Sequence, residues 1–235
     1  MKTIGMIGGM SWESTLSYYQ QLNQGVKHAL GGLHSAKICL YSVDFAPIEQ
    51  LQHQGDWDKM ADILIDAAKH VQAGGADFLL ICTNTMHKVA PQIQANVSIP
   101  LLHIADATAK QLKIDGITKV GLLGTMFTME QDFYKQRLIQ DFGIDVVIPN
   151  STSRQVVHDI IYQELCLGKI SSVSKEAYLG IMNELAADGA QAIILGCTEI
   201  ALLVSQTDTN IPLYDTTSIH AKAAVEDAVG NELLL

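Results

Sequence analysis

Positive charge is scarce in this chain of 235 residues, which has 15 lysines and arginines against 25 aspartates and glutamates. Because the formal net charge of −10 would repel nucleic-acid phosphates, and no basic cluster offsets it locally, we expect no nucleic-acid partner. Apolar runs long enough to cross a bilayer are missing, and Gly5, Gly8 and Gly9 interrupt any signal-peptide core near the N-terminus. We therefore expect a cytoplasmic protein with no membrane partner.

Cysteines are few and scattered along the chain. Cys39, Cys82, Cys166 and Cys197 form no CxxC pair and no spacing typical of metal ligands. This pattern predicts reduced thiols and no metal site. The first glycine turn does not match GxGxxG, so it gives little support to a nucleotide site. What the chain does have is 48% hydrophobic residues, which is enough to bury a core.

The chain also contains an internal repeat. Residues 77–90 (DFLLICTNTMHKVA) resemble residues 191–204 (QAIILGCTEIALLV), with Thr83 and Cys197 at equivalent positions. Three further pairs recur in the same order at a separation of roughly 114 residues: Gly5 and Gly121, Gly75–Ala76 and Gly189–Ala190, Ile99–Pro100 and Ile211–Pro212. Such constant spacing indicates a duplicated α/β unit.

Strand and helix signals alternate in both halves. Strands are predicted at residues 3–7, 37–43, 77–81, 100–103, 119–123, 145–148, 192–195 and 212–214. Helices are predicted from residue 12, over 60–71, from 86, and over 130–142, 154–167, 175–188, 199–204 and 218–229. This α/β pattern predicts two pseudo-symmetric Rossmann-like lobes with mainly parallel, four-stranded sheets. We assign residues 1–115 plus 214–235 to the N-terminal α/β lobe and residues 116–213 to the C-terminal one.

The reactive side chains lie at strand ends, where parallel sheets bind ligands, so we expect an active site in the inter-lobe cleft. Cys197 precedes a predicted helix, whose unpaired N–H groups should lower its thiol pKa from about 8.5 and favour the thiolate. Thr83 is a poor base without an activator, but it can deliver a proton. The neighbouring Cys82 aligns with Gly196 and faces the other side of the strand, so we favour Thr83 as the second group.

The motifs ICTNTMH, LGCTEI, GMIGGMSWEST and PLYDTTSIHA resemble those of the aspartate/glutamate racemase family, over essentially the whole chain. The resemblance implies a racemase that uses no pyridoxal phosphate or other cofactor. In that family two cysteines flank the α-carbon of the substrate. Thr83 replaces the first, as in the branch specific for L-aspartate and L-glutamate. The resemblance therefore implies that Cys197 serves the L-enantiomer, and that a homodimer forms.

Candidate substrate contacts lie beside these two residues. Hydroxyls and amides at the predicted helix starts suit a carboxylate. We expect contacts from Met10, Ser11, Asn84, Thr85, Thr125 and Thr198, and the resemblance adds Gln52 and Lys169. Helix capping is the alternative role for Ser11 and Thr125. The sequence has only two arginines, so an arginine clamp on both carboxylates is not expected.

Several assignments stay open at this stage. His87 could polarise Thr83 or satisfy a polar helix end, and Glu199 could orient a proton relay or complement a helix dipole. The same scaffold supports hydantoin racemases, maleate isomerases and decarboxylases. Outside enzymes, a protein that only binds acidic amino acids is the alternative, because Thr83 is a weak base. The preference between aspartate and glutamate is not determined by the motifs.

Overall fold

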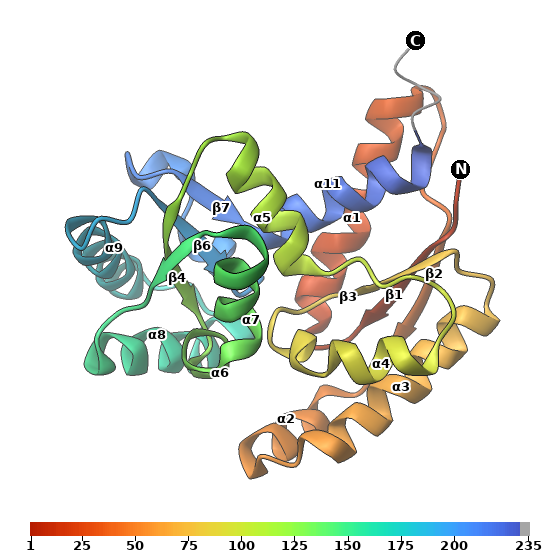
Figure 1. Cartoon of the computed structure of the whole chain (residues 1–235), viewed down its shortest axis with the longest axis horizontal. Helices are drawn as coiled ribbons and strands as arrows, with labels where there is room; N and C mark the ends of the chain where they lie inside the picture. The colour runs from red at the N-terminus through yellow and green to blue at the C-terminus, as the bar shows by residue number, and fades with distance from the viewer. Residues whose placement is uncertain (231–235) are drawn as a thin grey trace. The chain divides into compact units, whose positions relative to one another are not determined.

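The computed structural model describes residues 1–230, which form two compact units (Figure 1). The first unit contains residues 1–104 and the segment from His220, and the second contains Ala105–Ile219. The chain therefore passes between units at 104/105 and 219/220, whereas the repeat had suggested 115/116 and 213/214.

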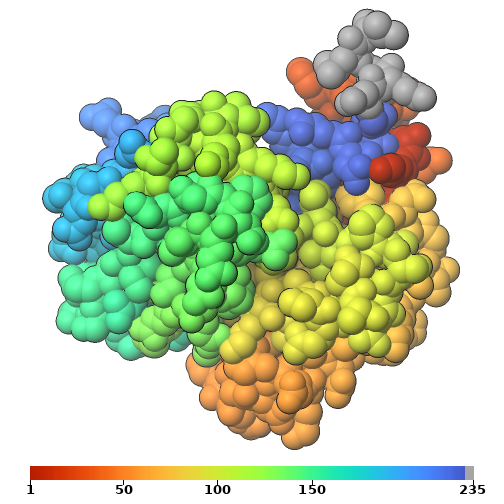
Figure 2. All heavy atoms as spheres, viewed as in Figure 1, coloured from red at the N-terminus to blue at the C-terminus, as the bar shows by residue number. Residues whose placement is uncertain are grey.

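The first unit is built on a parallel sheet with the order β2-β1-β3. Its strands are β1 (Ile4–Gly8), β2 (Ile38–Ser42) and β3 (Phe78–Ile81). Its helices are α1 (Trp12–Leu30), α2 (Phe45–Gln54), α3 (Trp57–Ala73), the 3-10 helix η1 (Thr85–Val89), α4 (Ala90–Asn96) and, mostly, α11 (Thr216–Val229). Side chains of α1 and α11 cover one face of the sheet, and those of α2, α3 and α4 cover the other. In the space-filling view the helices hide most of the strands (Figure 2).

The second unit is built on a four-stranded parallel sheet with the order β5-β4-β6-β7. Its strands are β4 (Lys119–Gly124), β5 (Asp145–Val147), β6 (Ala192–Gly196) and β7 (Leu213–Asp215). Its helices are α5 (Ile104–Ile114), α6 (Met126–Glu130), α7 (Asp132–Gln136), the π-helix η2 (Arg137–Asp141), α8 (Ser151–Gln163), η3 (Leu165–Leu167), α9 (Ser172–Ala187), α10 (Ile200–Leu203) and η4 (Gln206–Asp208). Residues of α8, α9 and α10 pack against β6 in one apolar core.

The predicted α/β class with two parallel sheets is confirmed, with differences in detail. The first sheet has three strands, because the expected strand at residues 100–103 makes only a single parallel bridge between Leu101 and Leu79. Helices α2 and α5 were not predicted. The helix expected over 130–142 is divided into α7 and η2, and a separate helix, α6, ends at Glu130.

Gly5 and Gly121, the first pair of the repeat, both lie where a sheet contacts a helix. A Cβ built on Gly5 would lie 2.5 Å from Val71 Cγ1 of α3 and 2.7 Å from the Phe78 carbonyl oxygen of β3. A Cβ on Gly121 would lie 2.6 Å from Ile193 Cδ1 and 3.0 Å from Leu185 Cδ1. Close approach of neighbouring elements therefore explains the repeated glycine in each unit.

We predict that Gly5→Ala destabilises the protein by about 1–3 kcal/mol, because a methyl group there overpacks a site that includes a backbone oxygen. Gly180→Ala is the matched control, since a Cβ at this helical position has no atom within 4 Å. Its expected effect is a gain of about 0.5–1 kcal/mol. Urea unfolding of both variants checks this, and an unaffected Gly5→Ala protein would contradict it.

Candidate active site

The second unit places Cys197 directly after β6, in a buried pair with Glu199. The Cys197 Sγ donates a hydrogen bond to Glu199 Oε2 at 2.9 Å, and the Thr198 hydroxyl donates to the same oxygen at 2.7 Å. Cys197 is 8% exposed and Glu199 is 3% exposed. Three consecutive residues therefore form one connected group in which a carboxylate accepts from a thiol and a hydroxyl.

The expectation that a helix N-terminus lowers the pKa of Cys197 is wrong. Burial raises the pKa of this thiol well above its ordinary value, and the nearby charge of Glu199 and the Cys166 thiol raise it further. The Glu199 backbone N–H acts in the opposite direction but does not outweigh them. Helix α10 has only four residues, so its dipole is small. The thiol is consequently the protonated partner in this structure.

The first unit places Thr83 at the corresponding end of β3. Thr83 is half-buried, and its carbonyl oxygen accepts a hydrogen bond from His87 Nδ1 at 2.8 Å. Cys82 lies on the other face, in the core between β1 and α11, where burial raises its thiol pKa far above the ordinary value. Cys82 is therefore held within the core, and the catalytic role of Thr83 stays a prediction.

His87 fixes the backbone around Thr83 and does not approach the Thr83 hydroxyl through Nδ1. A carbonyl oxygen can only accept, so His87 Nδ1 must carry the proton. Its Nε2 accepts from the Ile104 backbone N–H at 3.2 Å. Both ring nitrogens are thus committed to the backbone, in the neutral form. The sequence left two roles open for His87, and the structure shows the one in which His87 satisfies polar backbone groups.

His87 belongs to a cluster of buried histidines in the first unit. Its ring centroid lies 4.5 Å from that of His103 and 5.9 Å from that of His220. His220 Nε2 donates to the Leu102 carbonyl and its Nδ1 accepts from the Tyr18 hydroxyl, both at 2.8 Å. Burial lowers the pKa of His220 to about 4 and that of His87 well below its ordinary value. This cluster was not anticipated, because its members are far apart in the sequence.

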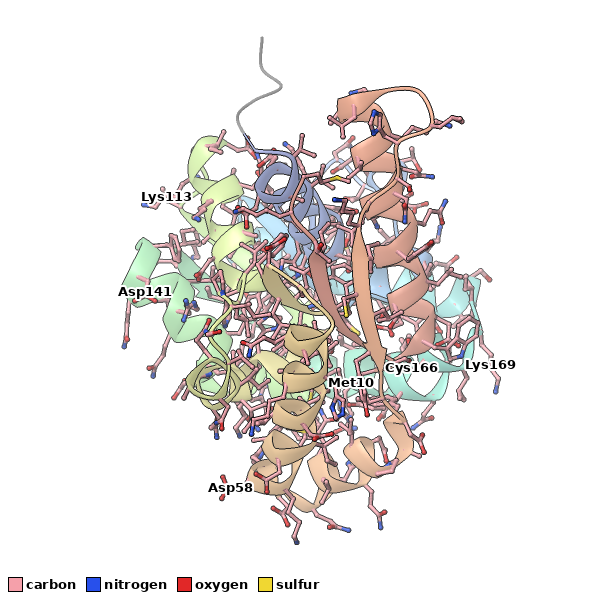
Figure 3. All side chains as sticks on the ribbon, turned by 90° about the vertical axis from the view of Figure 1, so that its right-hand side faces the viewer. Met10, Asp58, Lys113, Asp141, Cys166 and Lys169 are labelled. Atoms are coloured by element: carbon pink, nitrogen blue, oxygen red, sulfur yellow. The ribbon has the colours of Figure 1, made fainter. Side chains whose placement is uncertain are left out.

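The expected substrate contacts have varied positions within their units. Ser11 and Thr125 cap α1 and α6, accepting from the Ser14 and Thr128 backbone N–H groups at 3.3 Å, so the capping role is real at both. The remaining residues divide by burial: Met10, Gln52, Asn84 and Thr85 are buried, Thr198 is half-buried, and Lys169 is exposed. Figure 3 shows the Lys169 side chain projecting away from the ribbon. Their substrate contacts stay predictions.

Both arginines are used within the second unit. Arg137 forms a two-point ion pair with Asp106, which raises the pKa of its guanidinium. Arg154 pairs with Glu130 at 2.8 Å and donates to the Pro149 carbonyl at 2.7 Å. These partners give each arginine a structural role.

Two classes of site have no candidate in the described part of the chain. Across residues 1–230, no group of three or more histidine, cysteine, aspartate or glutamate side chains is placed to hold a metal ion. Over the same residues, none of the helices combines the length and the apolar character needed to cross a membrane.

Comparison with known proteins identifies the family of the chain. The family model described as Asp/Glu/Hydantoin racemase matches residues 7–224. The chain belongs to this family. It is 57% identical to a candidate Asp/Glu racemase from Yersinia pestis, with a TM-score of 0.92 and coverage of 98% of this chain and 100% of that one.

More distant racemases also match nearly the whole chain. An aspartate racemase homologue from Pyrococcus horikoshii OT3 is 33% identical, with a TM-score of 0.85 and coverage of 98% of this chain and 100% of the other. The broad specificity amino-acid racemase RacX of Bacillus subtilis (strain 168) is 24% identical over 94% of this chain and 96% of its own length. The fold and the family are thus established over both units.

We predict that Glu199→Gln lowers the pKa of Cys197, because the substitution removes the negative charge beside the thiol. At a fixed pH near 8, alkylation of Cys197 by iodoacetamide should then accelerate by about tenfold for each unit of pKa lowered, since the thiolate is the reactive form. Peptide mapping by mass spectrometry measures this rate. Glu164→Gln, whose carboxylate binds Ser174 instead, is the control. A rate that is unchanged or slower in Glu199→Gln would contradict the prediction.

The buried histidines predict a stability that falls in acid. Their pKa values are depressed in the folded state, whereas unfolded histidine titrates near 6.5. Stability is therefore fully present above about pH 6.5 and decreases toward pH 4, by about 1.4 kcal/mol per pH unit for each histidine.

Urea unfolding between pH 7 and pH 4.5 measures this slope. His220→Gln should reduce the slope of unfolding free energy against pH by the equivalent of about one proton, or about 1.4 kcal/mol per pH unit. The reason is that the unfolded chain then has one histidine fewer to protonate. His34→Gln, at an exposed position, should leave the slope unchanged. Equal slopes in the wild type and His220→Gln would argue against a neutral His220.

Proposed function

We propose that this protein is a cofactor-independent racemase that interconverts L- and D-aspartate, and also glutamate, with a preference for the L-substrate. The observation that carries the proposal is the Cys197–Glu199 pair at the end of β6, together with Thr83 at the equivalent end of β3. Aspartate and glutamate are the substrates in the names of similar proteins. Because the chain belongs to a family of racemases, we propose that its reaction transfers a proton at the α-carbon of the substrate.

Glu199 supplies what Cys197 needs to act as a base. The resting thiol is protonated and donates to the Glu199 carboxylate, which is the acceptor within reach for its proton. Binding of an α-ammonium group would add a positive charge near the thiol and favour its ionisation. The thiolate then takes the α-proton of the L-substrate, and Glu199 is a positioning residue that prepares this step.

The second half of the reaction is the return of a proton on the opposite face. The Thr83 hydroxyl would deliver this proton, and His87 holds the Thr83 backbone through its carbonyl. Backbone N–H groups at the strand ends, with Ser11, Asn84, Thr85, Thr125 and Thr198, would stabilise the carboxylate as it gains enediolate character. We include Met10, Gln52 and Lys169 as further substrate contacts.

The weakness of Thr83 as a base has a thermodynamic consequence. The equilibrium constant of a racemisation is unity, so net conversion must have the same kcat/KM in both directions. A preference for the L-substrate must therefore appear in another quantity. The α-proton of the L-substrate should exchange with solvent, without inversion, faster than the α-proton of the D-substrate. In this mechanism Cys197 removes the proton of an L-substrate and returns a solvent proton to the same face, faster than Thr83 delivers one to the other.

Proton NMR in D₂O tests this, with L- and D-aspartate and L- and D-glutamate as separate substrates. We expect the α-proton signal of L-aspartate to disappear faster than chiral chromatography shows inversion. Cys197→Ser should reduce this exchange by about 10²–10⁴-fold, the usual contribution of a general base. Cys39→Ser, a half-buried cysteine of β2, is the matched control.

Thr83→Cys then examines the second base. This variant should gain exchange from the D-substrates and faster net inversion in both directions, because a thiol replaces the hydroxyl. Equal exchange from both enantiomers in the wild type would contradict the role of Thr83 while preserving racemisation. Absence of exchange from all four substrates, with binding seen as a raised Tm, would favour a binding protein.

A further inference from the structure

The buried histidines of the first unit lie where the chain passes between the two units. The chain leaves the first unit after Ile104 and returns to it at His220, and His103 comes directly before the point of departure. The centroid of the His87 ring lies 4.5 Å from that of His103 and 5.9 Å from that of His220. Two crossings that are far apart in the sequence are therefore joined, within the first unit, by one cluster of rings.

The departing chain is hydrogen-bonded to two of these histidines. His220 Nε2 donates to the Leu102 carbonyl at 2.8 Å, and the Ile104 N–H donates to His87 Nε2 at 3.2 Å. The Leu102 N–H in turn donates to the Leu79 carbonyl of β3 at 3.0 Å. One strand and two imidazole rings thus fix the backbone at the first crossing, and one of these rings belongs to the returning chain.

His87 extends this connection to the candidate active site. Its Nδ1 donates to the Thr83 carbonyl at 2.8 Å, while its Nε2 accepts from the Ile104 N–H. One planar ring therefore joins the turn that follows β3 to the point at which the chain leaves the unit. Because the ring is rigid, the Thr83 backbone cannot shift unless Ile104 moves with it or one of the two bonds breaks.

The connection requires uncharged rings. A protonated imidazole carries a hydrogen on both nitrogens and has no acceptor left. Protonated His87 would lose the hydrogen bond from the Ile104 N–H, and protonated His220 would lose the one from the Tyr18 hydroxyl at 2.8 Å. Each ring therefore makes both of its bonds only in the neutral form.

The surroundings of the two rings keep them neutral. The titratable groups that face His87 are His103 and His220, and Tyr18 of α1 faces His220. Cys82 of the same core has a thiol pKa that burial raises far above its ordinary value, so it stays uncharged. Burial lowers the pKa of both rings, and the charges of His103 and His220 lower that of His87 further.

We propose that His87, His220 and Tyr18 form a latch that positions Thr83 for proton transfer, by fixing the Thr83 turn and both chain crossings to one another. We call these three residues the histidine latch. Its members are positioning residues, which act through backbone groups and through each other. A proton donor that must reach one face of an α-carbon loses rate steeply when it is displaced. The role in catalysis rests on the proposed function, in which Thr83 delivers the second proton.

The variant His87→Asn separates the latch from the local bond to Thr83. The side-chain amide of Asn places an N–H close to the position of Nδ1, and it has no acceptor at the position of Nε2. The bond to the Thr83 carbonyl can therefore persist, while the bond from Ile104 is lost. We expect the ratio of inversion to α-proton exchange, measured with L-aspartate, to fall by about 10–10²-fold, because Thr83 alone is displaced. Exchange itself, which Cys197 performs, should stay as in the wild type.

A second variant changes only one atom at the far end of the latch. Tyr18→Phe removes the hydroxyl that bonds to His220 Nδ1 and keeps the ring of Tyr18 in the core. The same ratio should fall by about two- to tenfold, the contribution of one hydrogen bond. This variant decides the matter if His87→Asn does not fold, as judged by circular dichroism.

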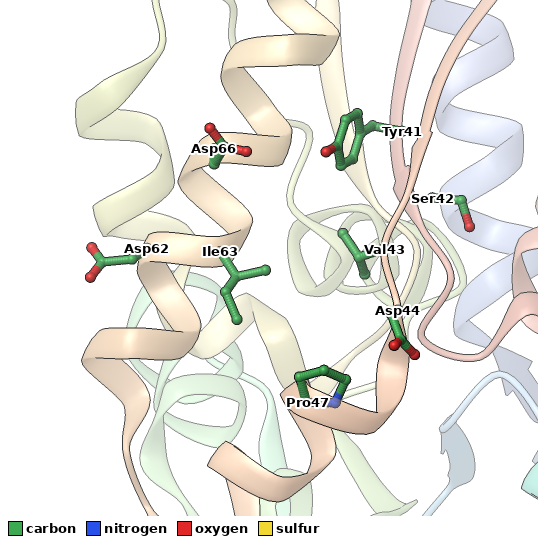
Figure 4. A pocket seen from close by; sticks show the side chains of 8 residues that line it. All are labelled: Tyr41, Ser42, Val43, Asp44, Pro47, Asp62, Ile63 and Asp66. Atoms are coloured by element: carbon green, nitrogen blue, oxygen red, sulfur yellow. The ribbon is translucent and has the colours of Figure 1, made fainter.

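His70→Asn is the matched control. His70 makes the same local bond as His87, from Nδ1 to the carbonyl oxygen four residues earlier, that of Asp66, at 2.8 Å. Its ring is exposed and stacks on Tyr41, beside a cavity of about 530 Å³ that Tyr41, Asp62 and Asp66 help to line (Figure 4). The ratio of inversion to exchange in this variant should equal that of the wild type.

Hydrogen–deuterium exchange of the Ile104 amide, followed by NMR, tests the latch without any substrate. The amide should exchange about two- to tenfold faster in His87→Asn than in the wild type, because its acceptor is gone. Equal amide rates would overturn the latch, whatever the activity of the protein. A faster amide with an unchanged ratio of inversion to exchange would overturn its role in positioning Thr83, as would a proportional loss of both activities. A wild type that exchanges no α-proton would refute the proposed function instead, and the amide rates would still decide whether the latch exists.

Discussion

Parallel pairing of strands decides where the reactive side chains of this protein can lie. Residue Ile7 pairs with Ile81, and Gly124 pairs with Gly196, so β1 and β3 end close together in the first unit, as β4 and β6 do in the second. Whatever follows those strands is held at the carboxyl edge of the sheet by backbone hydrogen bonds. Thr83 and Cys197 occupy that position in their respective units, and this explains why a duplicated α/β unit provides equivalent positions for the two proposed catalytic groups.

The sequence predicts the strands well because their apolar residues are continuous and local in the chain. Helix α2 was missed because it buries only Ile48 and Gln52, which leaves almost no apolar stripe to detect. The buried histidine cluster was missed for another reason: His87 and His220 meet only after folding. The fold class is thus accessible from local pattern, and so is the position of Cys197 and Thr83 as candidates after two strands, whereas long-range polar contacts are not.

The pKa of the Cys197 thiol cannot be predicted from the spacing of residues in the sequence. A Gly-Cys-Thr-Glu turn before a helix suggests a thiolate at a helix N-terminus, and that inference assumes a helix with a sizeable dipole. The helix that forms has four residues, and the glutamate turns back to accept from the thiol. Desolvation and a nearby carboxylate both disfavour the thiolate, and they outweigh the few backbone N–H groups present.

A raised thiol pKa suits the proposed chemistry better than a lowered one. The α-proton of an amino acid is a very weak acid, and a thiolate of depressed pKa would be a weak base toward it. A thiolate formed in a buried site with a high pKa is a stronger base toward this proton. The cost is that the thiolate must be generated when substrate binds. In the proposed mechanism the carboxylate of Glu199, 2.9 Å from the sulfur, accepts the thiol proton while the ammonium group of the substrate compensates the charge of the thiolate.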